Sequence, residues 1–365
     1  MIHYLEVFPE ETDPERAVAR LTEAAGGIEQ RLNPFTEIIL SFPVRDLTPR
    51  YDSLLEGVGA TSEVTKLNGF VTALQDQALL ALHRGEADLA LRNCRAIDRL
   101  ARSFSAPDLV HHLVAESFGK VVQTIIIDGI RLQAWEMGHL ADLSEILSEG
   151  LKKQQLIGAF SYEAALVPSS IEDARAIRGK ISDVITEAFD LPPDEPPSLR
   201  VRLQEWIHFD GPRGWEQRRK ALVLNSILDL IESVNEWEWK RVDPVVIDMD
   251  EASEERFSFD PLAEVRDAGR TYSNSISAAI KHASRARLCQ LAIHLEMFRL
   301  EHGDYPLTIM DLPKEHQLAD PADPRERVFG FNHLSEGGFR VDSLFFKEQF
   351  PDSEFDQVFW EIPGR

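Results

Sequence analysis

Histidines and carboxylates at short spacing are the first residues to test for chemistry, because these groups bind metals and move protons. His111 and His112 are adjacent in a predicted helix, where neighbouring side chains point about 100° apart and share no face. His294, Glu301 and His302 do share a helix face, but two turns separate the first from the others. Neither set brings three ligands to one ion, so we predict no metal site and no cofactor.

Catalytic motifs are equally scarce. No Gly-x-Ser-x-Gly elbow, P-loop, dinucleotide fingerprint or His-Glu-x-x-His sequence occurs. The acidic stretch 248–260 lacks the glycine at the sixth position and the oxygen ligand at the fifth position of a calcium-binding EF-hand loop. Glu163, between apolar residues, is open to two interpretations: a buried functional carboxylate, or a structural one that caps a helix or pairs with an arginine. We predict no catalytic residue.

Two tryptophans are the best candidates for binding a partner. Trp237 and Trp239 lie two positions apart in a predicted helix, so they cannot both lie on one face. At least one is therefore expected to be exposed or to end the helix, and exposed tryptophan favours protein contacts. The structural alternative is packing beneath the acidic segment that follows.

Charge limits the classes of partner. The chain carries 62 acidic and 39 basic side chains, a formal charge of −23, which repels nucleic acid and anionic lipid. We expect a protein partner or self-association and no nucleic acid. The N-terminus has no apolar signal region, and no uninterrupted apolar run of about 18 residues occurs. This segment itself is therefore expected to be soluble and to make no membrane contact.

The elements that must position these residues are mostly helical. Apolar residues at three- and four-residue steps predict an antiparallel helical hairpin over 62–104, with Gly85 ending its first helix in a left-handed conformation. The next helix, after Asp108, is apolar nearly all round and is expected to be central. Residues 34–52 contain several prolines and predict an irregular connection. Cys94 and Cys289 are too few for a disulfide scaffold and are expected to be buried thiols.

The chain divides at the proline-rich stretch "LPPDEPP", residues 191–197, which predicts a stiff linker. We predict a helical body over 1–190, a helical extension with an acidic excursion over 198–270, and a long helix with a small sheet over 271–365. The fold class is mainly α: a multi-helix array of antiparallel hairpins with a small α+β C-terminal region. Its long helix, predicted to start near 271, ends at Gly303.

Three strands are predicted after that helix, confined to roughly the last 45 residues. The sequences are "RVFGFNHL", "GFRVDSLFF" and "QVFWEIP", which together predict a three-stranded antiparallel sheet. In the second, Phe339, Val341 and Phe345 alternate with polar or outward positions, although the pattern is imperfect at its far end.

The junction after the long helix resembles the C-terminal half of the type II secretion pseudopilin family. That family has a helix ending in a Gly-x-Tyr-Pro turn, an Asp-Pro before the sheet, and a Ser-Leu loop before the last strand. The matching positions here are Gly303, Tyr305, Pro306, Asp320-Pro321 or Asp323-Pro324, Ser343-Leu344 and Asp356. The resemblance implies that the small sheet folds back on its own helix, with Gly303, Tyr305 and Pro306 as the structural junction.

The helical part is similar to a group of uncharacterised bacterial envelope-associated proteins, through the stretch "LHRGEADLALRNCRAIDRLARSF". Proteins of that group carry a membrane anchor, a helical body and a pseudopilin-like tail. The resemblance therefore implies association with the cell envelope through an anchor upstream of Met1. It implies no activity, and the residues alone leave the localisation unknown.

The resemblance and the residues disagree about calcium. The family binds calcium in the loop before its last strand, whereas the corresponding residues 343–356 contain no glycine with which to curl around an ion. Asp352, Glu354 and Asp356 are the carboxylates available there. The phenylalanines of the loop, Phe345 among them, are expected to pack on the long helix in place of the metal. We predict no structural calcium.

These observations favour a non-enzymatic structural or protein-interaction module, associated with the cell envelope. Two alternatives stay open. One is a free-standing adaptor of stacked helical hairpins, although no fixed 34-residue period recurs. The other is a hydrolase whose site lies between the helical body and the C-terminal sheet.

Overall fold

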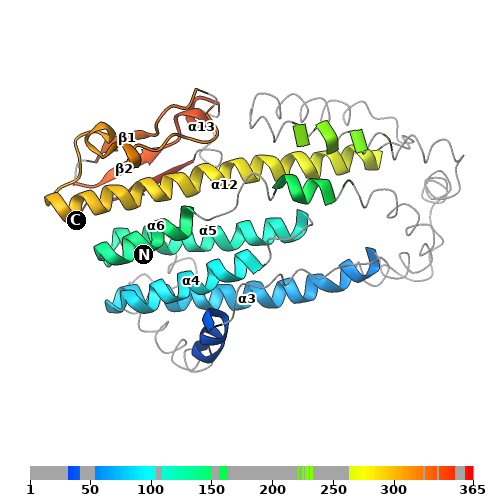
Figure 1. Cartoon of the computed structure of the whole chain (residues 1–365), viewed down its shortest axis with the longest axis horizontal. Coiled ribbons are helices and arrows are strands. Elements are labelled where there is room, and N and C mark those ends of the chain that lie inside the picture. The colour runs from blue at the N-terminus through cyan, green and yellow to red at the C-terminus, as the bar shows by residue number, and fades with distance from the viewer. Residues whose placement is uncertain are drawn as a thin grey trace, which may run out of the picture.

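The computed structural model is mainly helical, with one small antiparallel sheet (Figure 1). Helices account for 74% of the residues that it describes, which confirms the predicted fold class. Those residues are 32–41, 54–103, 109–148, 156–162, 164, 221, 224–225, 227–229, 231–232, 263–323, 325–334, 337–349 and 358–364.

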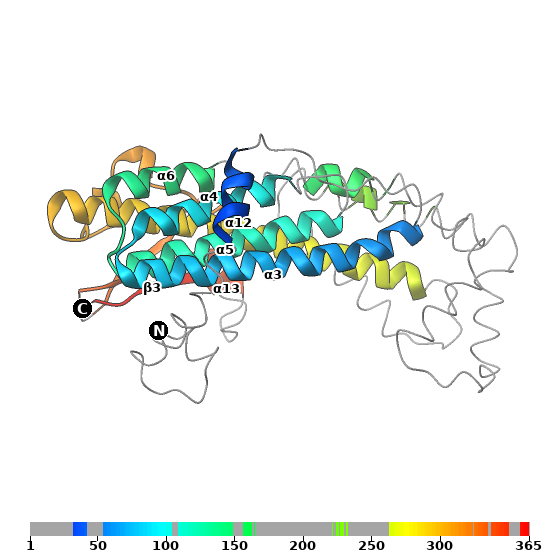
Figure 2. The ribbon, with the colours of Figure 1, turned by 90° about the horizontal axis from the view of Figure 1, so that it is seen from below.

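Five long helices lie within the described residues (Figure 1). They are α3 (Leu54–Arg84), α4 (Ala87–Ser103), α5 (Leu109–Arg131), α6 (Met137–Ser148) and α12 (Ala263–His302). Helix α5 packs against α3, α4 and α12, so the prediction that it is central is confirmed. Figure 2 shows α3, α5 and α12 running side by side along the long axis.

The middle of α5 explains why it is central. Ile125, Ile126, Ile127 and Ile130 are all fully buried, and this stretch is apolar nearly all round the helix, with only Thr124 and Asp128 half-buried beside them. Burying one such side chain stabilises the fold by about 2 kcal/mol, so a helix with this sequence must be covered by several partners.

The α3–α4 connection is tight because Gly85 adopts a left-handed conformation, with φ of 74°. The N–H of Glu86 donates to the carbonyl of Ala81 at 2.8 Å, and the N–H of Gly85 donates to that of Leu82 at 3.2 Å. This pair of bonds is the Schellman motif that closes many helix ends. The predicted hairpin and the predicted role of Gly85 are both confirmed.

The prediction of an irregular connection over 34–52 is wrong for residues 34–41, which are helical together with residues 32 and 33. Despite Pro34, the positions Leu32, Thr36 and Leu40 keep a four-residue helical spacing. Leu32 and Thr36 are buried, and the carbonyl of Leu40 accepts a hydrogen bond from Arg99 Nη1 of α4 at 2.7 Å. Packing against the hairpin therefore outweighs the proline signal.

The sheet consists of β1 (Gly330–His333), β2 (Phe339–Asp342) and β3 (Phe359–Ile362), in the order β1-β2-β3 with both pairs antiparallel. All three predicted strands are present, and in the described part of the chain every strand lies at or after residue 330. The sheet lies along the C-terminal half of α12 (Figure 1).

The second predicted strand is shorter than expected, and Phe345 is not part of it. The strand ends at Asp342, and a short helix, α13 (Leu344–Gln349), follows. Ser343 caps this helix: its Oγ accepts a hydrogen bond from the N–H of Phe346 at 3.2 Å. Phe345 and Phe346 are buried in the core, and the predicted contact of these phenylalanines with the long helix stays a prediction.

The sheet and the helical body share one hydrophobic core. At the end of α5, the guanidinium of Arg131 donates from Nε and Nη2 to the carbonyl of Glu361 in β3, at 3.1 and 3.0 Å. The indole of Trp360 donates to the carbonyl of Arg285 in α12 at 3.4 Å. The predicted division at residues 190, 198 and 271 stays a prediction; residue 271 falls inside α12, which begins at Ala263.

Both cysteines are buried free thiols, as predicted. Cys94 lies in α4 and Cys289 in α12, and burial raises the pKa of each thiol above its ordinary value. Buried thiols held neutral in this way are packing residues and poor nucleophiles.

Candidate functional site

The junction at the end of α12 is built on a helix that stops at Gly303. This glycine has φ of 88°, a left-handed conformation that costs other residues energy, and its N–H donates to the carbonyl of Arg299 at 2.8 Å. Nothing stands within 4 Å of where its Cβ would be, so the glycine is needed for the turn of the backbone and not for space.

Tyr305 fixes the direction of the chain after this turn. Its hydroxyl donates to Glu296 Oε2 at 2.7 Å, and its ring packs edge-on against Phe339 of β2 at 4.7 Å between centroids. Burial, together with the Glu296 carboxylate, raises the pKa of the phenol. The side chain therefore bridges the helix and the sheet, which is the junction role that the sequence assigned to it.

Glu296 is a buried carboxylate that the sequence analysis missed. Its side chain has no exposed surface, yet it accepts hydrogen bonds from Arg299 Nε at 2.9 Å and Nη2 at 2.6 Å, besides the one from Tyr305. A buried charge is costly unless it is paired and hydrogen-bonded, and here both conditions hold. Such a saturated carboxylate has a structural role, since no oxygen is left aimed at a substrate.

The chain after Tyr305 forms what we call the junction loop, residues 306–317. Three of its apolar side chains at a three-residue spacing are buried: Pro306, Ile309 and Leu312. His333 Nε2 of β1 donates to the carbonyl of Pro306 at 2.9 Å. Gln317 Nε2 donates to the carbonyls of Met310 and Leu312, at 3.2 and 2.8 Å.

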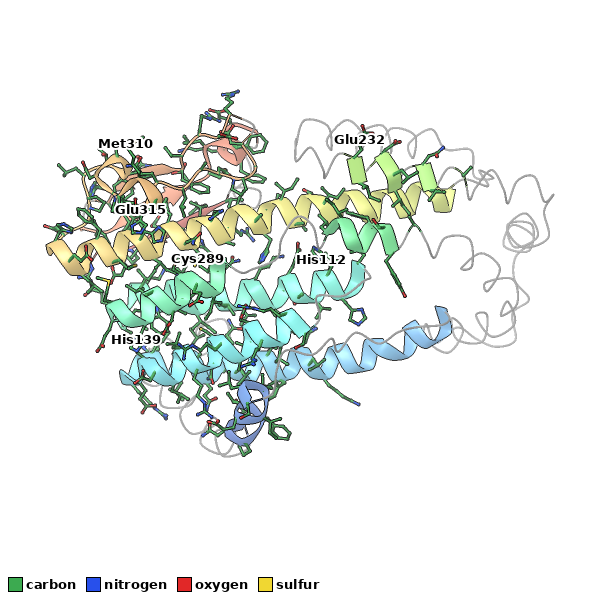
Figure 3. All side chains as sticks on the ribbon, viewed as in Figure 1. His112, His139, Glu232, Cys289, Met310 and Glu315 are labelled. Carbon is green, nitrogen blue, oxygen red and sulfur yellow. The ribbon has the colours of Figure 1, made fainter. Side chains whose placement is uncertain are left out.

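Two large apolar side chains of the same loop point outward. Leu307 is 81% exposed and Met310 is 62% exposed, the two highest values among the large apolar residues that the structure describes. Each follows a buried anchor by one position, Pro306 or Ile309, and points to a different side of the chain from it. Figure 3 shows Met310 beside the C-terminal end of α12, with Glu315 nearby.

A second buried carboxylate joins the sheet to α12. Asp320 accepts a 2.7 Å hydrogen bond from Ser284 Oγ of α12, one from Ser343 Oγ, and one from the N–H of Ala322 at 3.0 Å. Asp320 and Ser343 are two of the positions singled out by the resemblance to pseudopilins. The structure brings them into direct contact, with both side chains buried.

The adjacent histidines of α5 are both buried, and they do not form a metal site with the nearby carboxylate. His112 Nε2 lies 3.4 Å from Glu116 Oε1, and His282 of α12 packs against Gly119 of the same α5 face. Burial lowers the pKa of His282 to about 4, although Glu116 opposes the shift. In the described part of the chain no group of three ligands could hold a metal ion.

His294, Glu301 and His302 are not brought together. The buried His294 stacks on His316 of the junction loop, with ring centroids 4.0 Å apart, whereas His302 is exposed and stacks on Phe298. Burial, and next the neighbouring His316, lowers the pKa of His294 to about 4. Glu301 is exposed on the last turn of α12.

Several predicted residues lie outside the part of the chain that the structure describes. They are Trp237 and Trp239, Glu163, and the loop carboxylates Asp352, Glu354 and Asp356. Their predicted roles, including the absence of calcium in the loop, stay predictions.

Sequence reasoning also missed the outward-facing pair Leu307 and Met310, because "YPLTIMDLP" reads as an apolar stretch bound for the core. Both the buried set and the exposed pair are apolar at a three-residue spacing, so nothing in the sequence shows which of them the fold covers. Glu296 has an arginine three residues later on the same helix face, a spacing too common to single it out.

Among the residues that the structure describes, no helix is both long and apolar enough to cross a membrane. Comparisons with protein-family models, with curated proteins and with solved structures give no match.

Proposed function

We propose that this chain is a non-enzymatic protein-interaction module, associated with the cell envelope, whose contact surface is the junction loop. The observation that carries the proposal is the exposure of Leu307 and Met310 on a loop whose backbone is fixed. Exposed apolar groups that are held in one conformation bind with little loss of entropy, which is the property of a docking surface.

The buried polar clusters support a non-enzymatic role. Glu296 and Asp320 are the two buried carboxylates between α12 and the C-terminal region. Their oxygens accept hydrogen bonds from donors within the chain itself. Groups used in this way hold the sheet against α12 and are not available to a substrate.

A hydrolase is the second candidate, because Ser144 Oγ of α6 lies 3.5 Å from His294 Nε2, between the body and the junction loop. This contact is long for a nucleophile and its base. In the described part of the chain no carboxylate is hydrogen-bonded to His294 Nδ1, so none orients the ring. A pKa near 4 also makes His294 a weak base at neutral pH.

Envelope association rests on the sequence resemblance alone, and the helical-array adaptor differs from the proposal mainly in being free-standing. Fractionation of cells that natively express the chain separates these two: recovery with membranes supports the envelope role, and recovery only in the soluble fraction supports the adaptor.

Site-specific photo-crosslinking tests the contact surface. A benzophenone amino acid is placed at Leu307 or Met310 in cells that express the chain, with Phe35 and Leu228 as exposed apolar control positions (58% and 50%). We expect a discrete crosslinked protein from the two loop positions and none from the controls. Equal labelling at all four positions, or none, would contradict the proposal. A thermal-shift screen with metabolites tests the hydrolase.

A further inference from the structure

We infer that the junction loop docks a basic amphipathic segment of a partner protein, in which apolar side chains cover Leu307 and Met310 and flanking lysines or arginines face the acids around them. This inference rests on the proposed function and adds the chemical class of the partner. Three features of the loop carry it: the placement of its apolar side chains, the sign of the surrounding charge, and the rigidity of its backbone.

The apolar pair is small and is presented rigidly. Thr308 precedes the 3₁₀ turn η2 (Ile309–Asp311), and its backbone N–H donates a hydrogen bond to Asp311 Oδ2 at 2.8 Å. A second 3₁₀ turn, η3 (Lys314–His316), follows at once. Two side chains held three residues apart match one apolar stripe on a helix or strand of a partner, and not a broad flat interface.

The rim of this pair is acidic. Between residues 300 and 316 the exposed charged side chains are four acids and one lysine. Arg299 does not offset them, because it is engaged by the buried Glu296 in two hydrogen bonds. The four acids are Glu301, Asp304, Asp311 and Glu315, and the lysine is Lys314.

The acidic charge around the loop favours one class of binding partner over the others. A second copy of the chain would bring the same acidic rim against itself across a symmetric contact, where like charges oppose association. Anionic lipid headgroups and nucleic-acid phosphates meet the same repulsion. A segment with lysine or arginine beside its apolar stripe meets four acids against one lysine, so it is the occupant that the surface favours.

The test measures peptide binding to the full chain by fluorescence anisotropy in about 0.15 M salt, where long-range attraction to an acidic protein is largely screened. One probe is a synthetic helical peptide with leucines along one face and lysines elsewhere. The second replaces its lysines by glutamates, and the third keeps its composition but scatters the leucines over all faces. We expect the first peptide to bind at least about tenfold more tightly than the other two.

Variants locate the site. The double substitution Leu307→Ser/Met310→Ser should weaken the first peptide by about tenfold or more, because two apolar contacts are lost. Glu301→Gln/Asp304→Asn/Glu315→Gln should weaken it about fivefold or more and reduce the salt dependence. The matched control neutralises three exposed acids elsewhere and should change the affinity by less than about twofold: Glu86→Gln, Glu136→Gln and Glu232→Gln. Unchanged melting temperatures show that the variants fold.

The outcomes separate this inference from the proposed function. Two results would overturn the basic partner and leave the interaction role intact, provided that Leu307 still forms a crosslink. The first is equal binding of the lysine and glutamate peptides. The second is a rim variant that binds the peptide as tightly as its control variant does. A self-association that disappears in the Leu307→Ser/Met310→Ser variant, measured by sedimentation, also overturns the basic partner in favour of a second copy. Absence of crosslinks at the loop overturns both.

Discussion

The α3–α4 hairpin and the junction between α12 and the sheet both contain buried polar side chains, but these differ in charge. In the hairpin the buried amides of Gln77 and Asn93 form a neutral network, which also includes the exposed Asn33 of residues 32–41, through hydrogen bonds of 3.1 to 3.3 Å. At the junction, Glu296 and Asp320 are carboxylates that accept shorter bonds, several of them between 2.6 and 2.9 Å.

This difference reflects how much apolar surface each region buries. The hairpin belongs to a bundle of long helices, so packing supplies most of its stability and the amides only align the helices. The sheet has three strands of four residues each, which bury little on their own. Charge-assisted hydrogen bonds, roughly twice as strong as neutral ones, therefore add to the apolar packing between the C-terminal region and α12.

The largest effect is expected from a packing change in the body. A Cβ at Gly129 of α5 would lie 2.0 Å from Trp135 Nε1 and would displace an indole that is buried and donates to the carbonyl of Ile126. Gly129→Ala should lower the free energy of unfolding by about 3 kcal/mol or more, at the upper end for an overpacked core, measured by urea denaturation. Gly69→Ala, with nothing within 4 Å, is the control and should not destabilise. Equal costs would show that packing does not dominate the body.

As the pH falls, the packing of α12 around His282 and His294 should lose stability at a higher pH than the α3–α4 hairpin does. The folded-state pKa values of His282 and His294 are lowered to about 4, so between about pH 6.5 and 4 the unfolded chain binds more protons and stability falls as the pH falls. Each histidine should contribute a loss of about 2 kcal/mol between pH 7 and 5.

Hydrogen exchange measures this difference region by region. At pH 5 we expect protection in α12 to fall relative to α3 and α4. The double variant His282→Gln/His294→Gln should flatten the pH dependence, while His302→Gln, an exposed control on the same helix, should leave it unchanged. A uniform loss of protection in every helix would argue that these two histidines do not set the response.

Two matched substitutions test whether the carboxylate hydrogen bonds of the junction contribute more stability than the amide hydrogen bonds of the hairpin. Tyr305→Phe removes one donor from the Glu296 carboxylate and should cost about 2 kcal/mol, whereas Gln77→Leu breaks the amide network and should cost about 1 kcal/mol. In a double-mutant cycle, Tyr305→Phe should cost less when Glu296 is already glutamine. If Gln77→Leu proved the more costly change, the two regions would not differ as argued.

The smallest effect should be the same in both regions. Gly85 ends a hairpin helix and Gly303 ends α12, both with positive φ and with open space at the Cβ position. Replacing either with valine should destabilise by about 1 kcal/mol or more, because only the backbone is strained. An unchanged melting temperature for Gly85→Val would contradict the assigned helix end.

The helix ends and the strands could be predicted because single residues determine them. Gly85 and Gly303 favour positive φ by their chemistry, and the alternation in "GFRVD" needs no knowledge of the rest of the chain. Where tertiary packing decides, prediction failed: residues 32–41 are helical because the hairpin covers them, and Phe345 lies on a helix capped by Ser343.

The junction was predictable as a turn and not as a site. Tyr305 and Pro306 indicate a change of direction, but nothing local distinguishes Glu296 from the other acids in a chain with 62 of them. Its burial depends on Arg299 and Tyr305 closing over it, and the exposure of Leu307 depends on which side of the loop the sheet covers. Both are properties of the assembled fold.

The bond between Arg131 and Glu361 also has a consequence for synthesis of the chain. The two residues are 230 positions apart in the sequence. At a translation rate of about 5 to 20 residues per second, β3 is synthesised roughly 10 to 50 s after the end of α5. Throughout most of that interval the face of α5 that α12 covers is also without its partner. A chaperone that holds nascent apolar helices should therefore bind this chain after α5 emerges and release it once the C-terminal strand is made.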